Sequence, residues 1–347
     1  MFNKRPCIIA GPCSIESKEQ FIDVMSYLST NNQVDIIRCG IWKPRTRPGG
    51  FEGIGEEGLK WIKDYKKEFP NINFAIEVAQ PTHIELCLKY NIDVIWIGAR
   101  TSSNPFSMNE LSECLKGINI PVMIKNPPIP DVKLWIGAIE RIKNTGIKDI
   151  AAIHRGFFTH NNYGFRNNPL WEIPIEIKRT HPDLPLICDP SHISGNSSIV
   201  QSIAQSAMDL NFDGLMIEVH PYPSKALTDK EQQLTPSEFE ILLNNLIIRK
   251  NIDTTPIELD LLRKKIDMLD LELLSILSQR IEVSKQIASI KANNNMSVLQ
   301  INRWQEVLDS RMNSAEKLGI SPEFIQKIME QIHTESVRVQ DKIIKES

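Results

Sequence analysis

The residues best suited to chemistry fall just after short apolar runs in the first 245 residues of the chain. They comprise a thiol, an imidazole, two carboxylates and five cations: Cys13, Lys43, Arg45, Glu77, Arg100, Lys125, Arg155, His192 and Glu218. Thiolates, imidazoles and carboxylates bind divalent transition metals, and lysines and arginines bind phosphate and carboxylate groups. If these side chains share one pocket, the pattern indicates a site that binds anionic substrates around a metal ion.

Eight apolar runs would position these side chains, and each run is followed by a stretch long enough for a helix. The runs cover residues 7–10, 34–38, 73–78, 93–97, 120–125, 149–153, 184–188 and 213–219. Eight β–α units of this size predict an α/β fold, the (β/α)8 or TIM barrel. In such a barrel the C-terminal ends of all strands meet on one rim, so the reactive residues would face one pocket.

The composition argues against several classes of function. The 347 residues carry a net charge of −3, which gives no support to binding of nucleic acid or of a membrane surface. No apolar run approaches the roughly 20 residues that span a bilayer, and the first five residues lead into no apolar signal segment. The six cysteines match neither a disulfide framework nor a zinc-finger spacing, which predicts free thiols in a cytoplasmic protein.

The composition changes near residue 255. All six cysteines, 15 of the 16 glycines and 19 of the 21 prolines lie before Pro256, so turn-rich sequence gives way to nearly turn-free sequence. We therefore expect a barrel over residues 1–247, a linker over 248–255 and an all-helical domain over 256–347. Within that domain, helices are predicted over 256–292 and 299–318, and a third from 321 to the C-terminus.

The first predicted helix of the second domain needs a partner. Thr255 and Glu258 can form a capping box around Pro256. Apolar residues then recur every three or four positions, at Leu259, Leu262, Ile266, Leu269, Leu273, Ile276, Val283, Ile287 and Ile290. Such a helix would span about 55 Å at 1.5 Å per residue, too long for two shorter neighbours to cover. The stripe therefore predicts association with a second chain.

Four residues from separate segments form a candidate metal site. Cys13 follows the first predicted strand, His192 follows the seventh, and Glu218 and Asp229 end or follow the eighth. One thiolate, one imidazole and two carboxylates suit a divalent transition metal such as Mn²⁺, Fe²⁺, Co²⁺ or Zn²⁺. The alternative for a lone cysteine such as Cys13 is a small buried apolar side chain.

Five segments together resemble one enzyme family. Residues 11–17, 43–46, 98–100, 189–192 and 218–221 resemble 3-deoxy-D-arabino-heptulosonate 7-phosphate (DAHP) synthase of the short β subtype. The resemblance implies a metal-dependent barrel that condenses phosphoenolpyruvate with erythrose 4-phosphate. It implies that the metal is held by Cys13, His192, Glu218 and Asp229. Phosphoenolpyruvate would meet Lys43, Arg100, Lys125 and Arg155, and erythrose 4-phosphate would meet Arg45 and Thr46.

The chemistry implied by the resemblance suits these residues. The metal would polarise the aldehyde oxygen while the cations hold both phosphates and bring the reacting carbons together. Lys43 would either protonate the developing alkoxide or act only through its charge.

Two segments depart from the family. His154 stands where glutamate is common, which leaves the polarity of that corner of the pocket open, and residues 101–106 differ from the usual sequence. The sister family that makes 3-deoxy-octulosonate phosphate is the near alternative. It typically lacks the Lys-Pro-Arg-Thr found here at residues 43–46.

Two cations share one face of the long predicted helix. Lys291 follows Arg280 by 11 residues, so the side chains point about 20° apart at 100° per residue. Arg280 falls within the apolar stripe, where the alternative is an arginine that reaches from the edge of the stripe to water. Arg263 points to another side, which suits a different pocket, such as one in a dimer partner. Ser336 and Gln340 offer a polar pair on the third helix.

The helical domain resembles the all-helical chorismate mutases. Six residues stand where that family places its ligand-binding side chains: Arg263, Arg280, Lys291, Arg303, Ser336 and Gln340. The resemblance implies an intertwined homodimer that rearranges chorismate to prephenate, with charge on the breaking ether oxygen stabilised by Lys291 and Gln340. Gln300 and Trp304 replace acids that are common in the family. The alternative is therefore a dimerising chorismate or prephenate sensor with weak mutase activity.

The order of the two domains predicts a bifunctional shikimate-pathway enzyme with feedback. Prephenate carries two carboxylates, which suit the cations of the helical pocket: Arg263, Arg280, Lys291 and Arg303. We expect prephenate to inhibit the barrel allosterically, because the two predicted sites share no residues.

Overall fold

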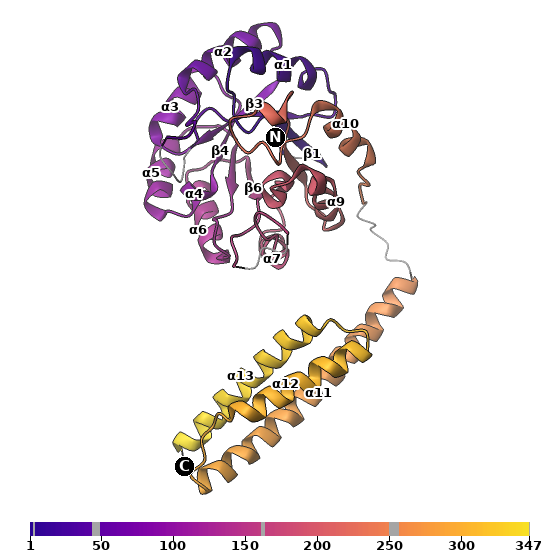
Figure 1. Ribbon diagram of the computed structural model, residues 1–347. Coiled ribbons are helices and arrows are strands. Elements are labelled where there is room, and N and C mark those ends of the chain that lie inside the picture. Colours follow the sequence, from indigo (N-terminus) through magenta and orange to yellow (C-terminus); the bar gives the residue numbers. More distant parts are fainter. Residues whose placement is uncertain (3, 44–48, 161–163, 250–256, 347) are drawn as a thin grey trace. The chain divides into compact units, whose positions relative to one another are not determined.

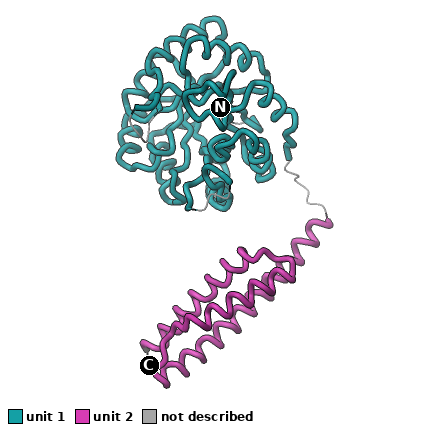
Figure 2. Tube along the Cα trace, in the orientation of Figure 1, with its two compact units in different colours: residues 1–250 teal, residues 251–347 magenta. Residues whose placement is uncertain are grey.

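The computed structural model describes residues 1–2, 4–43, 49–160, 164–249 and 257–346 (Figure 1). The chain divides into two compact units, residues 1–250 and 251–347 (Figure 2). Most of the predicted linker lies outside the described residues, and so do Thr255, Arg45 and Thr46. Within the described ranges, no helix is both long enough and apolar enough to cross a membrane.

Eight strands in the described part of the chain close into a parallel barrel, in chain order (Figure 1). They are β1 (Cys7–Gly11), β2 (Ile36–Cys39), β3 (Asn73–Val78), β4 (Val94–Ile97), β5 (Val122–Lys125), β6 (Ile150–His154), β7 (Leu186–Cys188) and β8 (Gly214–Glu218). The predicted barrel is confirmed. Its closure pairs β1 with β8, which places Gly11 opposite Glu218.

Six of the predicted runs begin one or two residues before the strand itself. At three of these starts an aspartate, Asp35, Asp93 or Asp213, accepts a hydrogen bond from a backbone N–H of a neighbouring strand. Asp35 accepts from Ile8 at 2.9 Å and Asp93 accepts from Phe74 at 2.8 Å. A side-chain carboxylate thus replaces the backbone ladder where these strands start, so an apolar pattern alone overestimates their length.

Helices and short helical turns surround the barrel. They are α1 (Lys18–Leu28), α2 (Glu56–Glu68), α3 (Pro81–Lys89), α4 (Ala99–Ser102), α5 (Pro105–Leu115), α6 (Val132–Lys143), α7 (Glu172–Thr180), α8 (Pro190–Ser194), η1 (Ser197–Ile199), α9 (Val200–Asp209), η2 (Pro223–Lys225) and α10 (Pro236–Asn245). Side-chain caps fix several helix starts, such as Ser17 on α1 and Asp131 on α6.

Alternate strand residues build two separate apolar layers. Inward-facing residues pack inside the barrel: Ile9, Ile36, Ala75, Trp96, Met123, Ile153 and Met216. Outward-facing residues pack against the helices. The same alternation turns Arg38, two residues after Ile36, toward the barrel interior.

His154, whose effect on the polarity of the pocket the sequence leaves open, does not line that pocket. His154 follows Ile153, an inward residue, so its ring lies on the outer face of β6. There its ring packs against four aromatic residues, at 5.4–6.4 Å between ring centroids: Trp135, Phe157, Trp171 and Phe212. Burial lowers the pKa of His154 to about 3. The histidine therefore changes the packing between the sheet and the helices and leaves the polarity of the pocket unaffected.

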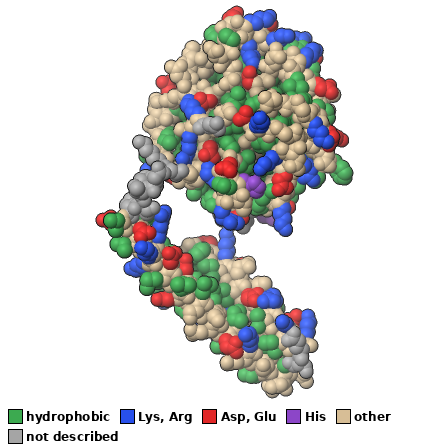
Figure 3. All heavy atoms as spheres, turned by 180° about the vertical axis from the view of Figure 1, so that it is seen from behind, with side chains coloured by type: hydrophobic (Ala, Val, Ile, Leu, Met, Phe, Trp, Pro, Cys, Tyr) green, Lys and Arg blue, Asp and Glu red, His purple; other side chains and the backbone are tan. Residues whose placement is uncertain are grey.

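Three described helices form the second unit: α11 (Ile257–Asn293), α12 (Ile301–Lys317) and α13 (Pro322–Glu346). α13 packs against both α11 and α12 (Figure 1). Apolar side chains nevertheless reach the surface of this unit (Figure 3). On α11 five residues of the predicted stripe are 53–60% exposed: Leu262, Ile266, Leu269, Leu273 and Ile276. One copy of the chain leaves this stripe uncovered.

Candidate active sites

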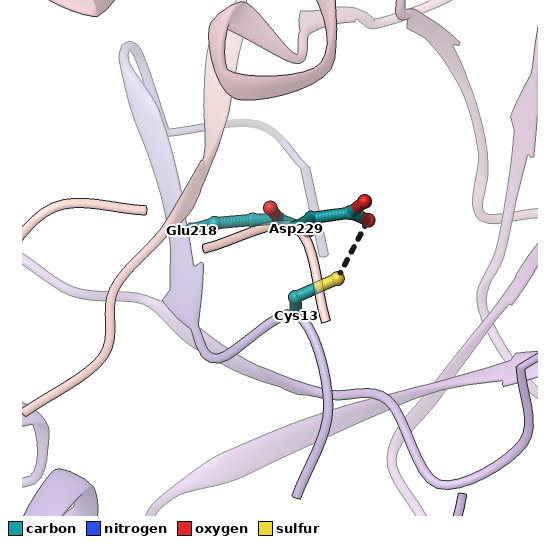
Figure 4. Close-up of side chains that lie close together, drawn as sticks. All are labelled: Cys13, Glu218 and Asp229. Atoms are coloured by element: carbon teal, nitrogen blue, oxygen red, sulfur yellow. Dashed lines mark hydrogen bonds between the residues drawn. The ribbon is translucent and has the colours of Figure 1, made fainter. Parts of the chain in front are cut away.

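Three of the four predicted metal ligands meet at the C-terminal rim of the barrel (Figure 4). The Cys13 sulfur and one oxygen from each of Glu218 and Asp229 all lie within 4.8 Å of one another. The Cys13 thiol donates a hydrogen bond to Asp229 Oδ2 at 3.1 Å. The fourth predicted ligand, His192, lies at the edge of this group, with Nε2 3.7 Å from Glu218 Oε1.

Local chain geometry brings these side chains together. The loop of Cys13 lies against Gly40, where an added Cβ would come within 2.1 Å of the Cys13 carbonyl oxygen. The short helix α8 starts directly after β7, and Asp189 caps it by accepting from the His192 backbone N–H at 3.1 Å. The Asp189 carboxylate also contacts His192 Nδ1 at 2.9 Å, which directs Nε2 toward Glu218.

The donor set fits a divalent cation. Glu218 Oε1 is buried and accepts no hydrogen bond within the described part of the chain. The Arg38 guanidinium lies 3.1 Å from it without hydrogen-bond geometry. Burial and the charge of Glu218 raise the pKa of the Cys13 thiol, so a bound cation is needed to stabilise its thiolate.

A lysine ammonium already lies against this cluster. Lys43 Nζ contacts Cys13 Sγ and lies 2.8 Å from Asp229 Oδ2. Burial opposes ionisation of Asp229, but the charges of Lys43 and His192 outweigh it and lower the pKa of that carboxyl. The cluster therefore carries an anionic carboxylate that attracts cations.

Four of the five predicted cations line a cavity of about 930 Å³ next to the cluster, and the fifth, Arg45, lies outside the described residues. Its walls include Lys43, Glu77, Arg100, Lys125, Arg155 and His192. Lys125 has a partner within the protein, the buried Asp189, at 2.7 Å. Burial lowers the pKa of Arg155 to about 10. The protein thus neutralises part of the charge of these cations itself.

Sequence reasoning missed several residues of this site, among them Arg38 and Asn167. Arg38 is 2% exposed and pairs with Glu218 on the inner face of the barrel. Asn167 accepts a hydrogen bond from Arg155 at 2.7 Å and donates one to the His192 carbonyl at 2.7 Å, which connects the cations to the candidate metal ligands. Asp189 was recognised only as part of a motif. The alternation along β2 is the signal that identifies Arg38, whereas Asn167 lies in a loop with no such signal.

The helical unit brings together four of its six predicted ligand-binding residues. Arg280 on α11 donates to Ser336 Oγ on α13 at 2.5 Å. Further along the same two helices, Lys291 on α11 donates to Gln340 Oε1 on α13 at 3.1 Å. Lys291, Ser336 and Gln340 are each at most 8% exposed. Burial lowers the pKa values of Arg280 and Lys291, and an anionic ligand would stabilise both charges.

The other two predicted residues lie elsewhere in a single copy. Arg263 is exposed on α11. Arg303 is 70% exposed and pairs with Glu306 at 2.9 Å. Trp304 stands where the resembling mutases commonly have an acid. Its ring stacks on that of His333, with ring centroids 4.0 Å apart. One chain therefore pairs Arg280 and Lys291 with residues of α13 and leaves Arg263 and Arg303 exposed.

Comparison with known proteins identifies both units. The DAHP synthetase I family matches residues 2–251, and chorismate mutase type II matches residues 262–341. A phospho-2-dehydro-3-deoxyheptonate aldolase from Thermotoga maritima is 30% identical over 239 residues, which cover 69% of this chain and 68% of the relative. A 2-dehydro-3-deoxyphosphooctonate aldolase from Campylobacter jejuni is 27% identical over 284 residues, covering 72% and 98%.

Solved structures agree with these matches. The crystal structure of the Thermotoga maritima DAHP synthase superposes with a TM-score of 0.62 at 30% identity, covering 70% of this chain and 68% of that one. Its truncated form gives a TM-score of 0.60 at 28% identity, covering 70% and 85%. The chain therefore belongs to the DAHP synthetase I family and is a bifunctional enzyme, with a DAHP synthase barrel followed by a chorismate mutase domain.

Proposed function

We propose that the barrel condenses phosphoenolpyruvate with erythrose 4-phosphate, using a divalent metal held by Cys13, His192, Glu218 and Asp229. The observation that carries this proposal is the position of the thiol–carboxylate cluster on the wall of a cation-lined cavity. A metal bound there supplies Lewis-acid polarisation of the aldehyde oxygen. Mn²⁺, Fe²⁺, Co²⁺ and Zn²⁺ all suit the donor set.

The cavity residues have separate roles in this proposal. Arg100, Lys125 and Arg155 bind the phosphate and carboxylate of phosphoenolpyruvate and orient its C3 toward the aldehyde. Lys43, in contact with both Cys13 and Asp229, delivers a proton to the alkoxide or stabilises its charge. Arg45 and Thr46 bind the phosphate of erythrose 4-phosphate, and they lie outside the described residues.

The sugar phosphate distinguishes the two related activities. An octulosonate product requires a five-carbon aldose, because phosphoenolpyruvate supplies three carbons, whereas a heptulosonate requires a four-carbon one. The Lys-Pro-Arg-Thr of residues 43–46 favours the four-carbon substrate. The test is phosphate release from phosphoenolpyruvate with either sugar phosphate, with metal supplied. No release with erythrose 4-phosphate would overturn the proposal.

The mutase site is completed by a second copy of the chain. The exposed stripe of α11 provides the surface for an intertwined homodimer. In that dimer, Arg263 of one protomer enters the pocket formed by Arg280, Lys291, Ser336 and Gln340 of the other. We assign the barrel to residues 1–247, the linker to 248–255 and the mutase to 256–347, in a cytoplasmic protein.

Prephenate is the proposed feedback effector of the synthase. The helical pocket binds the two carboxylates of prephenate through cations and shares no residue with the barrel cavity. Binding would therefore act on the barrel allosterically. An alternative is that the helical domain is chiefly a sensor, since Trp304 and Gln300 stand where the resembling mutases commonly have acids.

A further inference from the structure

Two adjacent buried glutamines follow β8, and neither was predicted from the sequence. Gln232 and Gln233 are each 1% exposed. Gln232 Nε2 donates to Glu218 Oε2 at 2.7 Å. Gln233 Oε1 accepts from the Cys13 backbone N–H at 3.0 Å, and its Nε2 donates to the Thr228 carbonyl at 2.8 Å. The pair therefore contacts three of the chain segments that carry the candidate metal ligands.

Arg166, from the loop after β6, extends this network to the second carboxylate. Its Nη1 donates to Gln232 Oε1 at 2.6 Å and to Asp229 Oδ1 at 3.0 Å. Because an arginine can only donate, the oxygen of the Gln232 amide must face Arg166 and its NH₂ must face Glu218. A continuous bridge thus runs from Glu218 through Gln232 and Arg166 to Asp229.

The bridge determines which carboxylate oxygens remain available. It occupies Glu218 Oε2 and Asp229 Oδ1, while the buried Glu218 Oε1 accepts no hydrogen bond among the described residues. Asp229 also has a φ of 46°, a left-handed conformation that surrounding contacts must hold in place. Asp229 therefore presents Oδ2 toward Cys13, and Glu218 keeps one oxygen, Oε1, that accepts no hydrogen bond from the described residues.

We propose that Gln232 and Arg166 are positioning residues for the metal site. They fix the orientation of the Glu218 and Asp229 carboxylates. This inference rests on the proposed metal site. Partners of metal ligands that lie outside the coordination sphere typically alter metal affinity by about 10–100-fold. The expected effect is therefore on metal affinity and on the ligand field, with Cys13 still able to bind.

The test is a Co²⁺ titration of the metal-stripped full chain, followed by absorption spectroscopy. Gln232→Met removes the donor to Glu218 at similar volume, and Arg166→Gln breaks the bridge at a side chain that is 45% exposed. We expect each variant to bind Co²⁺ about 10–100-fold more weakly. The thiolate-to-cobalt band should persist while the ligand-field bands shift. Gln201→Met and Arg249→Gln, exposed substitutions of the same types, should match the unmodified protein.

Each outcome bears on a different part of the proposal. Unchanged Co²⁺ affinity and unchanged bands in the two bridge variants would overturn the positioning role. If Gln232→Met does not fold, Arg166→Gln decides the question, because the Arg166 side chain belongs to the same bridge and lies at the protein surface. Absence of a thiolate-to-cobalt band in the unmodified protein would instead overturn the metal site itself, and the inference with it.

Discussion

The barrel and the helical unit differ in how much of an active site one chain provides. In the barrel, loops after β1, β2, β7 and β8 meet because the sheet closes on itself, so Cys13, Glu218 and Asp229 become neighbours. In the helical unit, Arg280 and Lys291 find partners on α13, but Arg263 and Arg303 remain exposed. A closed barrel completes its own inner surface, whereas the long amphipathic helix α11 leaves its apolar stripe uncovered in one chain.

The largest expected effect is loss of synthase activity alone. Cys13→Ser removes the thiolate and should lower DAHP synthase activity by at least about 100-fold, since the loss of a direct ligand exceeds that of an outer partner. Mutase activity should be unchanged, because the helical pocket shares no residue with the barrel. Phosphate release and chorismate consumption measure the two activities.

Cys114→Ser is the matched control for Cys13→Ser. Its thiol is partly buried and contacts the Pro81 carbonyl, away from the cavity. Equal synthase activity of Cys13→Ser and the unmodified protein, both assayed with limiting metal supplied, would reduce Cys13 to a buried apolar side chain.

The second prediction concerns the shared mutase pocket. Arg263→Ala and Arg280→Ala should each inactivate the mutase as homodimers. Mixed dimers carry one pocket with both arginines intact, so random mixing should restore about a quarter of the sites. Co-expression with two different affinity tags and a chorismate assay on the purified mixture tests this.

The complementation result separates two architectures. Recovery of activity requires that Arg263 and Arg280 of one pocket come from different chains. If the mixed dimer is as inactive as its parents, both arginines serve the same protomer. The helical site would then be supplied by one chain, like the site in the barrel.

The third prediction is feedback between the units. Prephenate should weaken synthase activity of the full chain through a coupling of about 1–3 kcal/mol, roughly 5–150-fold in affinity. Arg280→Ala should abolish this inhibition, because Arg280 is one of the cations proposed to bind prephenate. Synthase rates against prephenate concentration measure it. Equal inhibition of both proteins would place the effector site elsewhere.

The smallest expected effect is on the acid stability of the barrel. The folded pKa of His154, about 3, lies below its ordinary value of 6.5. Below pH 6.5 the unfolded chain binds a proton that the folded chain does not, so stability falls as the pH falls, at about 1.4 kcal/mol per pH unit for this group. His154→Phe should remove this slope.

Thermal unfolding midpoints between pH 7 and pH 5 measure the slope. His160→Asn, at an exposed histidine after the end of β6, is the control and should retain the slope of the unmodified protein. An unchanged acid slope in His154→Phe would show that other groups control the acid stability of the barrel.

Much of the architecture was predictable because it is encoded by local periodicity. Apolar runs separated by helical lengths predict a barrel, and turn-free sequence after residue 255 predicts long helices. The same spacing indicates that reactive residues such as Cys13, Lys43 and His192 gather on one rim. For α11, the length of the apolar stripe already shows that one chain cannot cover it.

Pairing and orientation depended on the tertiary structure. Lys125 meets Asp189, and Arg166 meets Gln232, only because strands and loops distant in sequence become neighbours when the barrel closes. His154 faces the helices because side chains alternate along β6, so a shift of one residue exchanges the pocket for the outer layer. The sequence by itself determined which elements form and which end of the barrel carries the chemistry. Closure of the barrel decided which charges neutralise one another and which oxygens remain for a metal, because those contacts join segments that no local pattern relates.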